Sequence, residues 1–469
     1  MIVAGGALLL VAAGAGVVMA RRGAETMAVA ARPSLPTAAS SSAGPSRAPS
    51  APAQPSASPS RAAAVNPYSR GAVPADPAAD PGPDPVFAQD DDLRRTETYT
   101  YRFSRPGDHR LAAGTYAFQY DVTTHALKAQ LAARRSKLAA ATGIALYLTG
   151  GTALTSADLA ALQGVHRDLG LTNLTRLYAY NLRTIEGGRE CTPNSGLACA
   201  GQTARGGLFP YLWFNGWWDT WVKHLVLDDL AAIPDGAFSN HTFAEVSMRS
   251  AVSAGVMAFG HGPRAKWSVL YLPSMRTIAH DAFRRNQGLR KVVLPRATTV
   301  DDYAFDDATS LRYFNAPQLE RLGRNALNDS GELLSVNFPK VRYLGINSLN
   351  GLATGLRLPA LTEVDKSAVS HLANLRWVYA PRLDRAWHDA ITDNPRLAVV
   401  YLPRVTRLGP RALRGNPALT RIFLGERPPR QEEDVFAGTG RARILHTGGA
   451  AAWAGFVPAG NPSLPVGRA

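Results

Sequence analysis

Cysteine is scarce in this sequence. Only two of its 469 residues are cysteines, Cys191 and Cys199. Their spacing matches no zinc-binding pattern, and no second Cys or His pair completes one. In an exported protein the two residues suit a local disulfide that closes a small loop, and two free thiols are the alternative. We therefore predict a Cys191–Cys199 disulfide, no metal site and no cofactor.

Catalytic motifs are missing as well. The sequence has no His-Glu-x-x-His helix, no Gly-x-Ser-x-Gly elbow and no phosphate-binding loop, and its ten histidines are scattered. No dense basic run with interleaved aromatic residues marks a nucleic-acid site. We predict a protein that is neither an enzyme nor a nucleic-acid binder. A hydrolase within residues 88–221 is the remaining enzymatic alternative.

Acidic residues are outnumbered by basic ones. The chain has 51 Lys and Arg against 36 Asp and Glu, which gives a net charge of +15. Such a balance favours acidic partners, including anionic cell-wall polymers. Ordinary solubility is the alternative explanation.

What the sequence does contain is a pair, an apolar residue followed by proline, that recurs through its second half. The pairs are Leu272-Pro273, Leu294-Pro295, Ala316-Pro317, Phe338-Pro339, Leu358-Pro359, Ala380-Pro381 and Leu402-Pro403, at spacings of 22, 22, 22, 20, 22 and 22 residues. A fixed period of this length predicts a solenoid. A solenoid in turn directs attention from a catalytic pocket to an extended surface.

Apolar residues return at fixed places in each unit. The segment before each proline alternates in character, as in Leu270-Tyr271-Leu272, which predicts a short strand that the proline ends. Nine and ten residues after the proline come pairs such as Ala282-Phe283, which we place on a short helical turn. Stacked units would bury one continuous core. We predict parallel strands on one face, with turns and short helical segments on the other.

These units resemble leucine-rich repeats of the BspA-like, bacterial surface-antigen type. Residues 277–286 and 407–419 follow the pattern of that class: Ile or Leu, a small residue, Ala-Phe or Ala-Leu, and then Asn. The resemblance is strong over residues 222–425 and weaker back to residue 146. It implies a leucine-rich-repeat solenoid with terminal caps, and it implies adhesion or protein binding.

The remaining segments surround this solenoid. We predict a signal peptide or membrane anchor at 1–30, a disordered Ala/Pro/Ser-rich linker at 31–87, an N-terminal capping module of hairpin and helix at 88–145, the solenoid at 146–425 with an insertion at 186–221, and a C-terminal cap with a loose tail at 426–469. The hairpin is expected over 96–122 and the helix over 124–142.

Two surfaces are candidates for binding. The outward-facing residues of successive strands should form ladders, and the predicted binding face consists of Tyr271, Tyr313, Asn315, Asn337, Arg357, Trp377, Tyr379, Tyr401 and Phe423. The insertion carries a second patch of Trp213, Trp217, Trp218 and Trp221. The alternatives are strand propensity for the ladder and a self-packed small core for the tryptophans.

The leading hypothesis is an exported, monomeric repeat protein, either tethered at the cell surface or secreted. It would bind an extracellular protein or glycan through these surfaces, and it would contact the membrane through residues 1–30 if that segment is not cleaved. The alternative is a structural envelope component that binds anionic wall polymers by charge.

Overall fold

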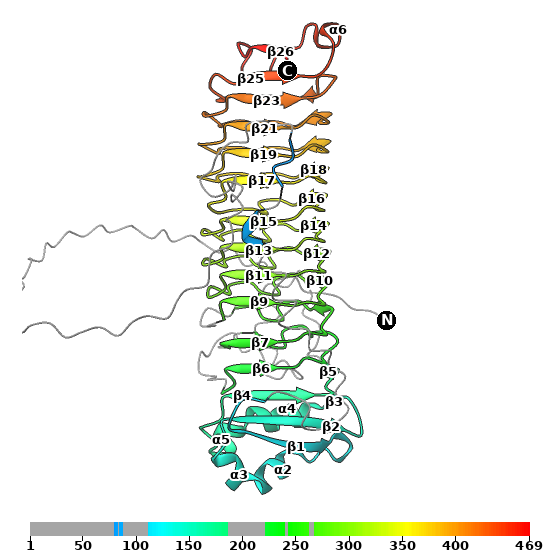
Figure 1. The fold of residues 1–469 in the computed structure, drawn as a ribbon, viewed down its shortest axis with the longest axis vertical. Coiled ribbons are helices and arrows are strands. Elements are labelled where there is room, and N and C mark those ends of the chain that lie inside the picture. The colour runs from blue at the N-terminus through cyan, green and yellow to red at the C-terminus, as the bar shows by residue number, and fades with distance from the viewer. Residues whose placement is uncertain (1–78, 83, 88–110, 186–220, 240–242, 262–266) are drawn as a thin grey trace, which may run out of the picture. The chain divides into compact units, whose positions relative to one another are not determined.

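The computed structural model describes residues 79–82, 84–87, 111–185, 221–239, 243–261 and 267–469, and all of them belong to one compact unit. The chain winds into a solenoid whose coils stack along one axis (Figure 1). Its strands pair in parallel, and each repeat contributes one strand to each of two ladders. The predicted leucine-rich-repeat solenoid is confirmed.

The front ladder consists of the strands that end at the repeating prolines, continued by the last strands of the chain. They are β9 (Val269–Tyr271), β11 (Lys291–Val293), β13 (Tyr313–Asn315), β15 (Ser335–Asn337), β17 (Gly355–Arg357), β19 (Trp377–Tyr379), β21 (Val399–Tyr401), β23 (Arg421–Leu424), β25 (Arg443–His446) and β26 (Val466–Arg468). The central residue of each short strand points into the core, so its two neighbours point outward. The proline then ends the strand because it has no N–H to donate.

The front ladder is divided between β15 and β17. Strands β9 to β15 form a four-stranded sheet, and strands β17 to β26 form a six-stranded one. The division falls in the unit that is 20 residues long, where Gly351 adopts a φ of 136°. A coil that is two residues short cannot keep both ladders in register, and here the front ladder is interrupted.

The back ladder is a second parallel sheet, which the sequence pattern did not predict. It consists of two-residue strands, β8 (Ser253–Ala254), β10 (Thr277–Ile278), β12 (Thr299–Val300), β14 (Arg321–Leu322), β16 (Tyr343–Leu344), β18 (Glu363–Val364), β20 (Arg385–Ala386), β22 (Arg407–Leu408) and β24 (Arg430–Gln431). These nine strands run without interruption. The back ladder therefore joins coils on both sides of the break in the front ladder.

The Ala-Phe pairs lie on turns, where we expected short helical segments. Asp281 and Tyr303 adopt left-handed backbone conformations with φ of 57°. A left-handed residue interrupts a helix, and the following amides donate along the solenoid axis instead. The N–H of Phe283 donates to the carbonyl of Ala304 at 2.8 Å, and that of Phe305 to the carbonyl of Ala326 at 2.9 Å. Each turn is thus bonded to the next coil.

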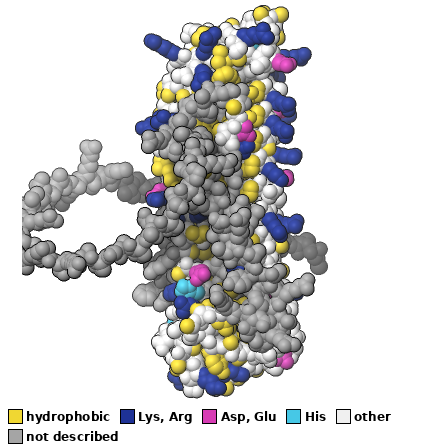
Figure 2. Space-filling model, in the orientation of Figure 1, with side chains coloured by type: hydrophobic (Ala, Val, Ile, Leu, Met, Phe, Trp, Pro, Cys, Tyr) yellow, Lys and Arg dark blue, Asp and Glu magenta, His cyan; other side chains and the backbone are white. Residues whose placement is uncertain are grey.

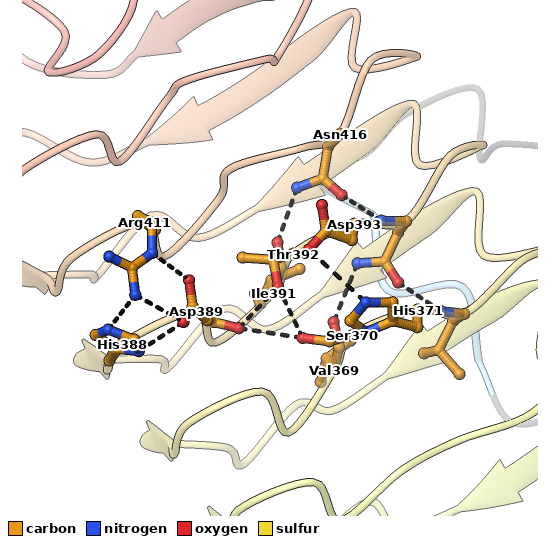
Figure 3. Close-up of polar contacts among 12 residues, drawn as sticks. Val369, Ser370, His371, His388, Asp389, Ile391, Thr392, Asp393, Arg411 and Asn416 are labelled. Carbon is orange, nitrogen blue, oxygen red and sulfur yellow. Dashed lines mark hydrogen bonds and ion pairs between the residues drawn. The ribbon is translucent and has the colours of Figure 1, made fainter. Parts of the chain in front are cut away.

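Stacked phenylalanines and buried asparagines fill the interior of these turns. The rings of Phe259 and Phe283 lie 5.2 Å apart, and those of Phe283 and Phe305 lie 5.1 Å apart. Asn416 is fully buried, and its amide donates to the carbonyl of Ile391 at 2.8 Å (Figure 3). The same amide donates to the carbonyl of Leu413 at 2.7 Å. These bonds satisfy carbonyls that would otherwise be buried without a partner.

The N-terminal part of the solenoid has longer strands and contains most of the helices. Its elements are β1 (Thr115–Asp121), η2 (Val122–Thr124), α2 (Leu127–Ala133), α3 (Arg135–Ala139), β2 (Gly143–Thr149), β3 (Ala153–Leu154), α4 (Ser156–Gln163), α5 (Val165–Leu169), β4 (Arg176–Tyr180), β5 (Thr184–Ile185), β6 (His224–Val226) and β7 (Glu245–Ser247). Strands β1, β2, β4, β6 and β7 form a five-stranded sheet in that order. The helix expected over 124–142 is present as α2 and α3. The second arm of the expected hairpin is β1, which pairs in parallel with β2, while its first arm lies outside the described residues.

The C-terminal tail is part of the fold, so our prediction of a loose tail was wrong. Strand β26 pairs with β25, and the N–H of Ala469 donates to the carbonyl of His446 at 2.9 Å. Before it, α6 (Ala450–Trp453) places the Trp453 ring on the His446 ring, with centroids 4.4 Å apart. These contacts cover the last coil of the core.

No helix in the described part of the chain is both long and apolar enough to cross a membrane. The predicted signal or anchor segment lies outside the described residues.

Candidate binding surface

The predicted ladder residues lie next to one another on neighbouring strands. In the six-stranded part of the front ladder, β17 to β26, which we call the upper sheet, Arg357 pairs in register with Tyr379, Tyr379 with Tyr401, and Tyr401 with Phe423. In the four-stranded part, β9 to β15, which we call the lower sheet, Asn315 pairs in register with Asn337. Tyr271 and Tyr313 belong to β9 and β13 of the same lower sheet, and both are half-buried.

The upper sheet carries an aromatic stack on its outer face. The rings of Tyr379 and Tyr401 are stacked at 5.4 Å with an interplanar angle of 5°, and the Phe423 ring lies 5.9 Å beyond Tyr401. All three side chains are half-buried. Because neighbouring strands are about 4.8 Å apart, rings at one position of the ladder stack along the solenoid axis. The result is a continuous apolar strip across three coils.

The lower sheet carries an amide pair at the corresponding position. Asn337 Nδ2 donates to Asn315 Oδ1 at 2.8 Å. Asn315 is 6% exposed, so it is not the solvent-facing residue that the sequence suggested.

Trp377 is also buried, which corrects its assignment to an exposed ladder. Its side chain is 2% exposed although it lies outside the core. The indole lies over Gly355 on the neighbouring strand: a Cβ atom at Gly355 would be 2.1 Å from Trp377 Cε2. The absence of a side chain at Gly355 therefore allows the tryptophan to lie flat on the sheet.

A segment from the predicted linker contacts this face. The Asp80 carboxylate accepts two hydrogen bonds from the Arg357 guanidinium, across 277 residues of sequence. The Arg357 side chain is 18% exposed and that of Asp80 is 42% exposed. Figure 1 draws the segment in blue over the middle of the front ladder. Residues 79–82 and 84–87 are thus placed against the solenoid, so the prediction of a disordered linker fails for them.

The segment is held by its own turns as well as by Arg357. Asp80 and Asp84 each accept a hydrogen bond from the backbone N–H two residues on, those of Gly82 and Val86, both at 3.0 Å. Such Asx turns fix short segments without a helix or strand. The short helix η1 (Pro85–Phe87) follows, and its Phe87 ring is 6% exposed although it is not part of the solenoid core.

The charges at this contact change the acidity of both neighbours of Arg357. The hydrogen bond from Arg357 holds the pKa of Asp80 below its usual range. The pKa of the Tyr379 hydroxyl is raised, first by burial and then by the nearby negative charge of Asp80. Arg357 and Tyr379 were among the predicted ladder residues and Asp80 was not. The one sequence signal for Asp80 is the Asp-Pro repetition in residues 76–85.

The tryptophan insertion lies almost entirely outside the described residues, as do Trp213, Trp217, Trp218, Cys191 and Cys199. Trp221 is described, and its indole is 3% exposed. Its Nε1–H donates to the carbonyl of Leu162 at 2.7 Å. Trp221 therefore packs into the solenoid core, so it is not part of a binding patch. Whether the other tryptophans form a small core of their own stays a prediction.

Basic side chains follow the prolines that end the front strands. Figure 2 shows Lys and Arg side chains in a row along one edge of this view. The exposed ones directly after a repeat proline are Arg296, Lys340, Arg382 and Arg404. Within the described ranges none of these four forms an ion pair, and Lys340 donates to Gln318. We call these four residues the basic ridge.

Titratable clusters on the turn side tie coils together. Arg411 reaches from one coil to Asp389 on the preceding one at 2.9 Å, and His388 lies 2.6 Å from the same carboxylate (Figure 3). A similar pair, His280 with Asp281, raises the pKa of His280. In the part of the chain that the structure describes, no group of three or more His, Cys, Asp or Glu side chains is placed to hold a metal ion.

The repeat geometry agrees with the comparison to protein families. The family described as the BspA-type leucine-rich repeat region matches residues 231–354 and 276–381, in six copies. This chain carries a BspA-type leucine-rich repeat region. The resemblance that we inferred from the Ile-Gly and Ala-Phe positions is confirmed for these residues.

Several solved structures match this chain at low identity. The pneumococcal vaccine antigen PcpA is 12% identical over 53% of this chain and 79% of its own, with a TM-score of 0.27. A leucine-rich cell surface protein from Faecalibacterium prausnitzii A2-165 is 15% identical over the same shares, with a TM-score of 0.24. Toll in the Drosophila Toll–Spätzle complex is 13% identical over 73% of this chain and 45% of its own, with a TM-score of 0.26. At these scores the likenesses say nothing of what this chain binds.

A search of curated proteins by sequence found no significant match.

Proposed function

We propose that this protein is an exported, non-enzymatic repeat protein of the cell surface, and that the front ladder of its solenoid binds a partner protein. The observation that supports this most directly is the row formed by Arg357 and the aromatic stack of Tyr379, Tyr401 and Phe423. A guanidinium beside aromatic rings is the combination that dominates protein interfaces.

The front ladder suits protein binding because a segment of the same chain already binds to it. Arg357 binds the carboxylate of Asp80 from a segment far away in the sequence. Bidentate pairing of this kind fixes both distance and direction. The neighbouring stack supplies apolar area at a small cost in side-chain entropy, because stacked rings are already ordered. A protein segment is therefore a better match to this surface than a glycan.

The test is binding of the full chain to a panel of extracellular matrix proteins, immobilised glycans and anionic wall polymers. The doubly substituted variant Tyr401→Ala/Phe423→Ala removes part of the stack. Its matched control is Tyr343→Ala, which removes an aromatic side chain from the back ladder. We expect the stack variant to bind its protein partner at least about tenfold more weakly than the control does.

Equal binding by the two variants would overturn the assignment to the front ladder. Binding to glycans alone, lost in the stack variant, would keep the surface and change the class of partner.

A second candidate function rests on the basic ridge. Four exposed cations without ion-pair partners in the described structure lie at one repeat position, so they could follow a linear anionic wall polymer along the solenoid. Binding of this type falls steeply with salt, whereas stacking changes little. The substitution Arg382→Gln/Arg404→Gln, compared at about 0.05 M and about 0.5 M salt, separates the two functions.

A further inference from the structure

We infer that residues 79–87 are an intramolecular ligand of the front ladder, and that a partner protein docks by placing an extended acidic segment on Arg357 in their place. The inference deepens the proposed function and rests on it for the partner. The occupancy of the site by residues 79–87 stands on the contacts of the structure itself.

Arg357 is positioned to receive a carboxylate from outside the solenoid. It is the last residue of β17, the first strand after the break in the front ladder. Its neighbour on the next strand is Tyr379. The Trp377 ring lies over Gly355, which is on the same strand as Arg357. The guanidinium therefore projects from the sheet beside a flat indole and a tyrosine. A planar guanidinium that can bind both oxygens of a carboxylate is a good receptor for it.

The segment that occupies this place has the features of a docking peptide. Prolines at 81, 83 and 85 restrict its unbound conformations, which lowers the entropy lost on docking. Its carboxylates form Asx turns with Gly82 and Val86, so its bound shape is encoded locally. One end is anchored by charge at Asp80, and at the other end the ring of Phe87 is buried outside the core.

The contact between Asp80 and Arg357 is weak enough to be exchanged. The pair is partly exposed to solvent, and a pair of this kind changes a binding equilibrium by no more than about fivefold. A partner with its own carboxylate can compete for the Arg357 guanidinium. The segment lowers the apparent affinity of that partner in proportion to the fraction of molecules in which it is docked. Residues 79–87 would then raise the partner concentration that is needed for binding.

The experiment uses a fluorescent peptide with the sequence of residues 79–87, Ala-Asp-Pro-Gly-Pro-Asp-Pro-Val-Phe, added to the full chain. The wild type is compared with Asp80→Asn, which releases Arg357 from its own carboxylate, and with Asp80→Asn/Arg357→Gln. The matched control is Glu332→Gln, which breaks the exposed ion pair between Arg312 and Glu332, 2.8 Å long, elsewhere on the solenoid.

We expect the peptide to bind Asp80→Asn about two- to fivefold more tightly than it binds the wild type or the Glu332→Gln control, the range that a partly exposed ion pair supports. Binding to Asp80→Asn should be weakened by a similar factor in the double variant and with a peptide that carries Asn at the position of Asp80. Equal binding to the wild type and to Asp80→Asn, or none to Asp80→Asn, would overturn the inference.

Hydrogen exchange keeps the test decisive if the double variant folds poorly. In Asp80→Asn alone, amides of β17 and β19 and those of residues 79–87 should exchange faster than in the Glu332→Gln control, and unchanged exchange would also count against the inference. Failure of the proposed function looks different: the peptide would behave as expected, while Tyr401→Ala/Phe423→Ala left partner binding intact.

Discussion

The front and back ladders are built by the same parallel pairing, yet their outer faces differ. On the back ladder the outward residues Arg321 and Arg385 are exposed, and Arg321 lies over the ring of Tyr343 at 4.4 Å. On the front ladder the outward residues Val293, Trp377 and Val399 are each 2% exposed, although none belongs to the core. The back ladder is solvated at these positions. On the front ladder Val269 of β9 is 48% exposed, so only the part from β11 to β21, which we call the covered face, has buried outward residues.

This difference shows on which ladder of a repeat protein another segment can lie. Most inward residues of both ladders are buried, so the inward positions reveal only the fold. The outward positions reveal whether another segment lies on the sheet. Residues 79–87 are one such segment, and their contact with Arg357 is on the covered face.

The largest expected effect comes from removing the tryptophan of the covered face. Trp377→Ala should lower the free energy of unfolding by about 3 kcal/mol, because it exposes the bare backbone at Gly355 and removes a buried ring. The corresponding change on the back ladder, Arg385→Ala, should stay within about 0.5 kcal/mol. Urea unfolding of both variants measures this. Similar losses in the two would end the distinction between the ladders.

The next effect tests the packing of Trp377 on Gly355. Gly355→Ala should cost about 1–3 kcal/mol because the new methyl group occupies the space of the indole. The cost should largely disappear in a Trp377→Ala background, since the clash is then relieved. Gly331→Ala is the control, because a Cβ there meets no atom within 4 Å. Additive losses in the double variant would contradict the assigned contact.

A smaller effect concerns the ion pair on the covered face. Arg357→Gln should change the unfolding free energy by less than about 1 kcal/mol, as expected for a partly exposed pair. Limited proteolysis within residues 79–87 should nevertheless become faster, because the anchor of the segment is lost. Glu332→Gln removes a comparable pair and should leave that cleavage rate unchanged. The same rate in both variants would mean that Arg357 does not hold the segment.

The smallest effect is a dependence on pH. Arg357 holds the pKa of Asp80 below its ordinary value, so the paired state is favoured above the unfolded pKa of about 3.9. Docking of residues 79–87 should be constant from neutral pH to about pH 5 and should be lost as the pH falls through the lowered pKa. Tryptophan fluorescence of the wild type against Asp80→Asn reports this, and an identical acid transition in both would exclude the contact as its cause.

The sequence predicts the front ladder well because each strand is marked by the proline that ends it. That mark places Arg357, Tyr379 and Tyr401 on adjacent coils. The back ladder is harder to predict, because two-residue strands such as Thr277–Ile278 are too short to show an alternating pattern. The sequence could not predict which ladder is covered. The contact of Asp80 with Arg357 spans 277 residues, and the burial of Trp377 depends on a glycine in the previous coil.

The shortened coil also has a mechanical consequence. The back ladder continues through nine strands, while the front ladder is divided between β15 and β17. A rod with one continuous side and one divided side bends most easily at the division, with the continuous side as the hinge. The Asp80–Arg357 contact lies on the first strand beyond that division. We therefore expect fluorescent labels on β13 and β19 to report a narrower distance distribution when residues 79–87 are docked than in Asp80→Asn, and an unchanged distribution would show that occupancy and bending are independent.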